Sequence, residues 1–183
     1  MRAFVAWNPA PAELDALESL QAALRRERDA PGYRWIPRDQ LHLTLRFLGE
    51  VDAERHAKLE PALAALALHE PPFAAQVAGW QYLPGRHAPR VLVLRIESRG
   101  AMERLAAGVE SVAREAGFAR ERRPFLAHLT LARTAFLERL PEPFLAPPPP
   151  IALAIDHVAL VRSDLASQDA RYRTVTRFVL ARA

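Results

Sequence analysis

The sequence predicts an α+β fold with mostly antiparallel sheets, built from two similar halves that face each other across a cleft. The main observation is a repeated tetrapeptide, HLTL, at residues 42–45 and again at residues 128–131. Each copy follows an earlier apolar segment at nearly the same interval: 38 residues separate Phe4 from the first histidine of the repeat, and 37 separate Val91 from the second. Both intervals run in the order strand, helix, HLTL strand. Self-similarity of this kind usually has a structural cause, so it indicates a duplicated unit.

The first half should contain a strand at 2–7, a helix at 11–28, a strand at 41–48 and a helix at 53–68. The first helix is expected because leucines recur at helical spacing up to Leu24, and Pro31 with Gly32 would end it. The strand at 41–48 is an apolar run that ends at Gly49. Asp52 can cap the second helix, since its carboxylate can accept a bond from a backbone N–H of the first turn.

The second half should contain strands at 73–82 and 91–96, a helix at 100–116, and strands at 125–131, 151–161 and 172–180. Pro71 and Pro72 separate this half from the helix before it, and residues 84–87 form a turn between its first two strands. Gly117 ends the third helix. Residues 141–150 are rich in proline and should be extended, and the last two strands should form a hairpin.

Each HLTL strand places a histidine beside a threonine. Side chains alternate between the two faces of a strand, so His42 and Thr44 share one face, as do His128 and Thr130, while the leucines point into a core. Histidine can serve as acid or base near neutral pH, and two of them can work on opposite sides of one reacting centre. Threonine hydroxyls can donate to the oxygens of a phosphate. The combination favours in-line displacement at phosphorus.

The paired H-x-T-x elements resemble those of the two-histidine (2H) phosphoesterases. The sequences of the two motifs most resemble those of the bacterial and archaeal RNA 2',3'-cyclic phosphodiesterases, which are also described as 2'-5' RNA ligases. The resemblance covers nearly the whole chain: the opening strand at 1–7, the signatures at 42–50 and 128–133, and a tail with Leu160, Ser163, Tyr172 and residues 178–180. One departure is Ala127, where proline often precedes the second signature.

This resemblance implies a single domain of two pseudo-symmetric lobes over residues 1–183, with helices flanking two sheets and the active cleft between the sheets. It also implies hydrolysis of a terminal 2',3'-cyclic phosphate to a 2'-phosphomonoester, a reaction that run backward is 2'-5' ligation. His42 would donate a proton to the leaving 3'-oxygen, and His128 would accept one from water. The residues alone do not distinguish these two roles.

The expected substrate site extends to two arginines and several aromatic residues. Alternation places Arg46 on the face of His42, where it would hold a phosphate. The same rule turns Arg133 away from His128, yet the resemblance assigns Arg133 to the substrate, and a bulge near Ala132 would turn it back. Tyr172 lies between two arginines and is the main candidate for contact with a nucleobase. The other aromatic candidates are Trp7, Phe47, Trp80 and Tyr82.

Composition limits the other classes of function. The chain has no cysteine, and its six histidines form no pattern typical of a metal site, so we expect neither a metal nor any other cofactor. Phosphate-binding glycine loops are absent from the sequence. No apolar run approaches 18 residues, which predicts a cytoplasmic protein without a membrane segment. The net charge of +4 suits a polyanion. The expected partner is RNA ending in a 2',3'-cyclic phosphate, tRNA fragments included, and the expected state is a monomer.

Two alternatives remain open from the sequence. One is a phosphodiesterase for a small cyclic nucleotide or an ADP-ribose cyclic phosphate. The other is a non-catalytic module that binds RNA or a nucleotide, although binding alone would not require two titratable imidazoles. Outside the repeats, His56 and His69 are expected in solvent, His87 in a turn, and His157 in a structural position.

Overall fold

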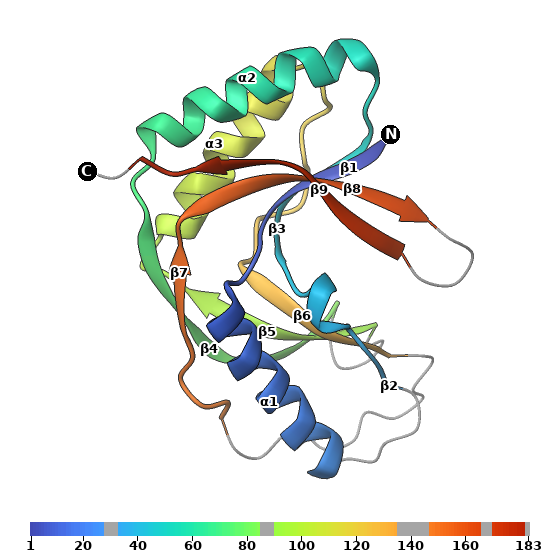
Figure 1. Ribbon diagram of the computed structural model, residues 1–183, viewed down its shortest axis with the longest axis vertical. Helices are drawn as coiled ribbons and strands as arrows, with labels where there is room; N and C mark the ends of the chain where they lie inside the picture. The colour runs from blue at the N-terminus through green and yellow to red at the C-terminus, as the bar shows by residue number, and fades with distance from the viewer. Residues whose placement is uncertain (28–32, 85–89, 135–146, 166–169, 182–183) are drawn as a thin grey trace.

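The fold is built from two antiparallel sheets and three α-helices in the described part of the chain (Figure 1). The computed structural model describes residues 1–27, 33–84, 90–134, 147–165 and 170–181. The helices are α1 (Pro11–Glu27), α2 (Ala53–His69) and α3 (Ala101–Glu115), and a 3-10 turn spans Arg38–Gln40. The strands are β1 (Arg2–Trp7), β2 (Tyr33–Trp35), β3 (Leu43–Glu50), β4 (Phe73–Leu83), β5 (Val91–Glu97), β6 (His128–Thr134), β7 (Ala152–Ile155), β8 (His157–Leu165) and β9 (Ala170–Val179).

Each sheet contains one strand of the repeat. The first sheet has the order β3-β1-β8-β9, and the second has the order β2-β6-β5-β4-β7. All of the strand pairs are antiparallel, which confirms the predicted α+β class. The order strand, helix, HLTL strand holds in the second half as β5-α3-β6, while in the first half β2 and the 3-10 turn come between α1 and β3.

The leucines of the repeat anchor both sheets in one core. Leu43, Leu45, Leu129 and Leu131 are all buried in the same cluster as leucines of the three helices. Helices α2 and α3 pack together on the first sheet, while α1 lies against the second (Figure 1). The side-chain amide of Gln21 on α1 donates to the backbone carbonyl of Leu131, which fixes α1 to β6. The opposite face of each HLTL strand is therefore left for function.

The structure corrects two of the expected elements. The strand predicted over residues 151–161 is broken at Asp156 into β7 and β8, which belong to different sheets. The break lets one apolar run serve both lobes, and the Asp156 carbonyl there accepts a bond from the N–H of Leu180. β8 pairs with β9 as the expected hairpin. The second correction is β2, a strand too short to stand out in the sequence.

Some sequence expectations concern residues without a described position. Residues 141–146 of the proline-rich segment lie outside the described residues, and residues 147–150 have no regular secondary structure. No helix in the described ranges is long and apolar enough to cross a membrane.

Candidate active site

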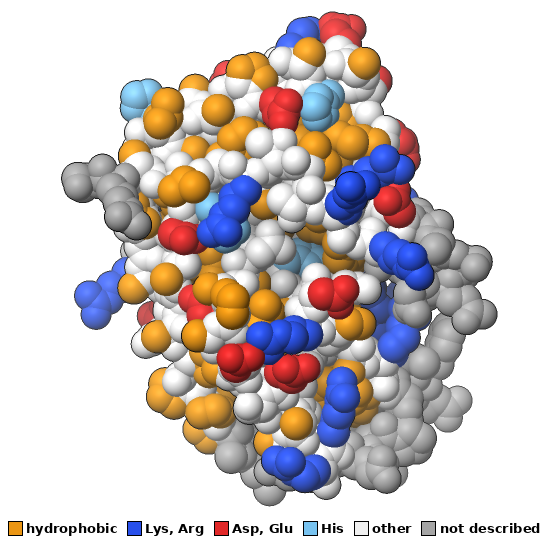
Figure 2. Space-filling model, viewed as in Figure 1, with side chains coloured by type: hydrophobic (Ala, Val, Ile, Leu, Met, Phe, Trp, Pro, Cys, Tyr) orange, Lys and Arg blue, Asp and Glu red, His pale blue; other side chains and the backbone are white. Residues whose placement is uncertain are grey.

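The two HLTL segments meet where the sheets adjoin. β3 is an edge strand of the first sheet; among the described residues, β2 pairs with Ala132–Thr134 of β6, and the Ile36 N–H donates to the Leu131 carbonyl next to this pairing. β3 and β6 contact each other where the two sheets adjoin (Figure 1). In the space-filling view, histidine surface lies in a hollow near the middle of the molecule, with Lys and Arg side chains along one side (Figure 2). We call the face of each sheet that carries the histidine and threonine of the repeat the site face.

Both histidines are held in the same orientation. The Nδ1 of His42 lies 2.7 Å from the carbonyl oxygen of Gln40, and the Nδ1 of His128 lies 2.7 Å from that of Leu126. A carbonyl oxygen can only accept, so each Nδ1 carries the hydrogen. Each Nε2 is therefore the nitrogen available to a ligand, and it can act as a base when the ring is neutral and as an acid when the ring is charged. The repeat thus supplies two histidines whose Nδ1 atoms have matching backbone partners.

His42 lies in an enclosed, partly aromatic environment. Its ring lies 4.8 Å from the ring of Phe4 and 5.1 Å from that of Tyr172. Burial lowers the pKa of His42, the bond to the Gln40 carbonyl acts against this, and the positive charges of His128 and Arg133 lower the pKa further. His42 is thus biased toward the neutral form until an anion arrives.

The two threonines lie beside the histidines. Thr44 and Thr130 are both half-buried, between leucines that are buried on the opposite face. Thr44 pairs with Ala6 of β1, and Thr130 pairs with Val93 of β5. Their hydroxyls belong to the site face of each sheet, as alternation predicts.

Beyond Thr44, a β-bulge changes which side chain reaches the site face. Thr44 pairs with Ala6 but Arg46 pairs with Val5, so β3 contains one extra residue there. The expectation that Arg46 shares the face of His42 is therefore wrong, because the bulge rotates the strand by one residue. Arg46 instead donates to the Glu110 carboxylate at 2.5 Å, and to the backbone carbonyls of Phe47 and Ala119.

The second HLTL strand has the equivalent bulge, with the opposite consequence for its arginine. Thr130 pairs with Val93, whereas Ala132 pairs with Leu92 and Arg133 with Val91. Val91 and Val93 share a face of β5, so Arg133 returns to the face of Thr130. The Arg133 side chain is exposed, and its charge acts on His42. The bulge considered for Ala132 is therefore present.

The two bulges place Phe47 and Arg133 at matching positions, each three residues after the threonine of its repeat. Phe47 pairs with Phe4, and the two rings lie 6.0 Å apart. Phe47 is 57% exposed, which is unusual for a phenylalanine in a sheet. One side of the site thus presents an aromatic ring where the other presents a guanidinium.

Tyr172 joins this aromatic side of the site. It is half-buried, and its ring meets that of Phe4 edge-on at 5.1 Å. Phe4 itself was missed as a site residue, although alternation along β1 separates it from the core residues Ala3 and Val5. Of the other aromatic candidates, Trp7 and Tyr82 are buried, and Trp80 packs against the core.

The remaining histidines lie elsewhere. His157 is buried, with its Nδ1 2.6 Å from the Asp156 carboxylate, in a structural position. His56 is half-buried on α2, His69 is exposed at the end of that helix, and His87 lies outside the described residues. Across the described ranges, no group of three or more His, Cys, Asp or Glu side chains is placed to hold a metal ion.

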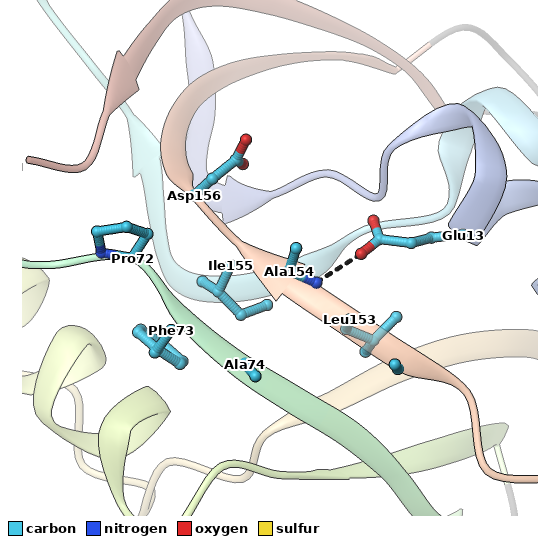
Figure 3. A pocket seen from close by; sticks show the side chains of 9 residues that line it. Glu13, Pro72, Phe73, Ala74, Leu153, Ala154, Ile155 and Asp156 are labelled. Atoms are coloured by element: carbon cyan, nitrogen blue, oxygen red, sulfur yellow. Dashed lines mark hydrogen bonds between the residues drawn. The ribbon is translucent and has the colours of Figure 1, made fainter. Parts of the chain in front are cut away.

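A shallow hollow of about 440 Å³ lies away from the repeat, between β4 and β7 (Figure 3). Its lining is mostly apolar, and Glu13 and Asp156 are its two acidic residues. Glu13 accepts hydrogen bonds from the N–H groups of Ala154 and Ala10, so its carboxylate joins α1 to β7 (Figure 3). The lining contains no histidine, lysine or arginine, and no residue of the repeat.

Residues 9–93 match the family model described as LigT like Phosphoesterase. The chain is 34% identical over 176 residues to an RNA 2',3'-cyclic phosphodiesterase of Thermus thermophilus, with 89% of this chain and 85% of that protein covered. It is 36% identical over 153 residues to the Escherichia coli protein of the same name, with 80% of each covered. It is 31% identical over 170 residues to a Geobacillus stearothermophilus protein of that name, covering 89% of this chain but only 54% of that relative.

Solved structures agree with these matches. The fold superposes on the crystal structure of TT0787 of Thermus thermophilus with a TM-score of 0.85 at 32% identity, covering 100% of this chain and 99% of that one. The Escherichia coli LigT complex with 3'-AMP gives a TM-score of 0.76 at 27% identity, covering 98% of this chain and 97% of that one.

Proposed function

The chain belongs to the family of LigT-like phosphoesterases, and we propose that it hydrolyses the 2',3'-cyclic phosphate at the end of an RNA strand to a 2'-phosphomonoester. The observation that carries this proposal is the matched pair of histidines, each with its Nδ1 on a backbone carbonyl and its Nε2 left for proton transfer. The relatives with the name RNA 2',3'-cyclic phosphodiesterase support the substrate class.

The reaction needs one base and one acid on opposite sides of the phosphorus. His128, in the neutral form, takes a proton from water through Nε2 while the water oxygen attacks phosphorus. His42, in the charged form, gives its Nε2 proton to the 3'-oxygen as the P–O3' bond breaks. The phosphate stays on the 2'-oxygen and the 3'-hydroxyl is released. The family resemblance assigns which histidine plays which role, and the roles exchange in the reverse direction.

Binding of the substrate prepares His42 for its role as the acid. Burial and nearby positive charge lower the His42 pKa in the free protein. The negative charge of the bound phosphate opposes both effects, because an opposite charge within a few ångströms favours the charged imidazole. Binding of the phosphate therefore favours the charged form of His42.

Thr44, Thr130 and Arg133 supply donors for the non-bridging oxygens of the phosphate. Charge on these oxygens increases as water attacks, so donors that are already in place stabilise the transition state. Arg133 is exposed on the site face and can offer two parallel N–H groups. Arg46 has no place in this set because Glu110 and two carbonyls hold its guanidinium.

The aromatic side of the site suits the terminal nucleobase. Phe47 is the most exposed ring there, with Phe4 next to it and Tyr172 beyond. Stacking of a base on an aromatic side chain tolerates any base, since every base has a π-face. The proposed arrangement therefore holds the terminal nucleoside on the first sheet while the phosphate lies between the two repeats.

The function is tested by incubating the protein with an RNA oligonucleotide that ends in a 2',3'-cyclic phosphate, and by identifying the product by phosphorus NMR. We expect a 2'-phosphomonoester. A 3'-phosphate would reverse the geometry at phosphorus, and an unchanged substrate would overturn the proposed function.

The acid and base roles are tested with a substrate whose bridging 3'-oxygen is replaced by sulfur. A thiolate leaves without prior protonation, so this substrate should restore turnover to His42→Ala and leave His128→Ala impaired. If this substrate restores turnover to His128→Ala and not to His42→Ala, His128 is the acid and His42 the base.

A further inference from the structure

Arg95 lies directly beside His128 on the second sheet. In the pairing of β5 with β6, Arg95 is opposite His128. Residues opposite each other in an antiparallel pair point to the same face, with Cβ atoms about 4.5–5.5 Å apart. Its chain neighbours Leu94 and Ile96 are in the core on the other face. The Arg95 side chain therefore starts on the site face, next to a histidine of the repeat.

The guanidinium of Arg95 has no counter-charge among the described residues. Arg95 is exposed, and its side chain makes no hydrogen bond or ion pair within the described part of the chain. Glu97, the next residue on the same face of β5, forms no ion pair with it in those ranges either. On its other side Arg95 pairs with Gly79, where an added Cβ would meet nothing within 4 Å. A charged donor therefore borders open space beside the site.

Arg95 is placed for a phosphate other than the one that reacts. Thr44, Thr130 and Arg133 already surround the position between the two repeats. Arg95 belongs to β5, which lies on the far side of β6 from β3, one strand spacing of about 4.8 Å further out. A phosphate bound at Arg95 would therefore be separate from the cyclic phosphate between the repeats. The phosphodiester on the 5' side of the reacting nucleotide is such a group.

We propose that Arg95 binds the phosphodiester on the 5' side of the terminal nucleotide, and so makes the enzyme prefer an RNA strand to a cyclic mononucleotide. This assignment rests on the proposed function. Arginine matches phosphate geometry with two N–H donors, and its uncompensated charge gains most from an anion. A nucleoside 2',3'-cyclic phosphate lacks the 5' phosphodiester, so it cannot use Arg95.

The test compares kcat and KM for two substrates: adenosine 2',3'-cyclic phosphate, and a short RNA that ends in the same nucleotide. Arg95→Ala should raise KM for the RNA about tenfold or more, with little change in kcat, since one charge-assisted contact is lost. KM for the mononucleotide should stay within about twofold, as no contact is lost there. The salt dependence of RNA binding should fall by about one unit of slope in Arg95→Ala.

Two further variants separate the contact from general effects of charge and folding. Arg104→Ala removes the same charge from the exposed side of α3 and should leave both substrates unchanged. Arg95→Lys keeps the charge and should recover part of the RNA affinity. Equal effects of Arg95→Ala on the two substrates, or no effect on either, would overturn the assignment. If the unmodified protein hydrolyses neither substrate, the proposed function fails and the Arg95 assignment fails with it. If the unmodified protein hydrolyses both substrates and Arg95→Ala shows no selective defect with the RNA, the Arg95 assignment is wrong and the proposed function still holds.

Discussion

Replacing Arg46 with alanine should weaken the fold and spare the chemistry. The Arg46 side chain is 10% exposed and donates to the Glu110 carboxylate, whose side chain is 25% exposed. It also donates to the carbonyls of Phe47 and Ala119, so the truncation removes donors from three acceptors at once. Hydrogen bonds to charged groups contribute about 1.5–3 kcal/mol each, and Glu110 keeps its bond from the Glu121 N–H. We expect a loss of about 2–3 kcal/mol, which for a chain of this size lowers Tm by roughly 4–12 °C.

Arg133→Ala is the matched comparison, because it removes the other arginine of the two signatures. Arg133 is exposed, so its loss should change stability by no more than about 0.5 kcal/mol. Its loss should lower kcat/KM roughly ten- to hundredfold, the value of a charged contact with the phosphate. Thermal unfolding followed by circular dichroism, and steady-state kinetics at two salt concentrations, measure the two effects.

The reasoning about the bulge would be refuted by the reverse pattern. That pattern is an Arg46→Ala protein of normal Tm with a salt-sensitive rise in KM, together with an Arg133→Ala protein of lowered Tm and normal turnover. A double-mutant cycle with Glu110→Gln isolates the ion pair: the Arg46 and Glu110 substitutions should be non-additive because the two side chains share one interaction.

Three other predictions concern the threonines and the titrating histidines. Thr44→Val and Thr130→Val should each lower kcat/KM by about 1–3 kcal/mol in transition-state free energy, and Thr→Ser should do less harm; valine variants with full activity would make the hydroxyls purely structural. In NMR titrations the pKa of His42 should lie below the ordinary value of about 6.5, and Arg133→Gln should raise it because a nearby positive charge is removed; an unchanged pKa would show that Arg133 lies too far away. Burial also lowers the pKa of His157, so the unfolded state binds protons more readily than the folded state. The free energy of unfolding should therefore be at its full value above about pH 6.5 and fall as the pH drops below it. Denaturant unfolding of His157→Gln should show a smaller decline, and an identical pH dependence in this variant would exclude His157 as its source.

Alternation in the two strands of the repeat was sufficient to predict which of its side chains share a face. A period of two requires only the local sequence, so the shared face of His42 and Thr44, the shared face of His128 and Thr130, and the buried leucines all followed from it. Burial of those leucines on a common core also explains why the two strands end up side by side.

The rule that side chains alternate between faces gave the wrong face for Arg46 and for Arg133, which both follow a bulge. A bulge is defined by the pairing with the partner strand, and the extra residue of β3 lies opposite the step from Val5 to Ala6 of β1. The local sequence alone therefore did not predict that Phe47, and not Arg46, lies on the site face. Simple alternation also placed Arg133 on the wrong face, because the bulge near Ala132 turns it back. Arg95 was missed for a similar reason: only the pairing of β5 with β6 places it beside His128. The break at Asp156 likewise could not be predicted locally, because the segments before and after it pair with strands of two different sheets.

The central claim is that His42 and His128 transfer the protons of the reaction. It is tested most directly by the turnover of a cyclic-phosphate RNA by His42→Ala and by His128→Ala, with Tm measured in parallel. Both side chains lie on the site face rather than in the core, so each variant should fold. Each should lose about 10² to 10⁴ in rate, the usual contribution of a positioned acid or base. Near-normal turnover by either folded variant would contradict the account.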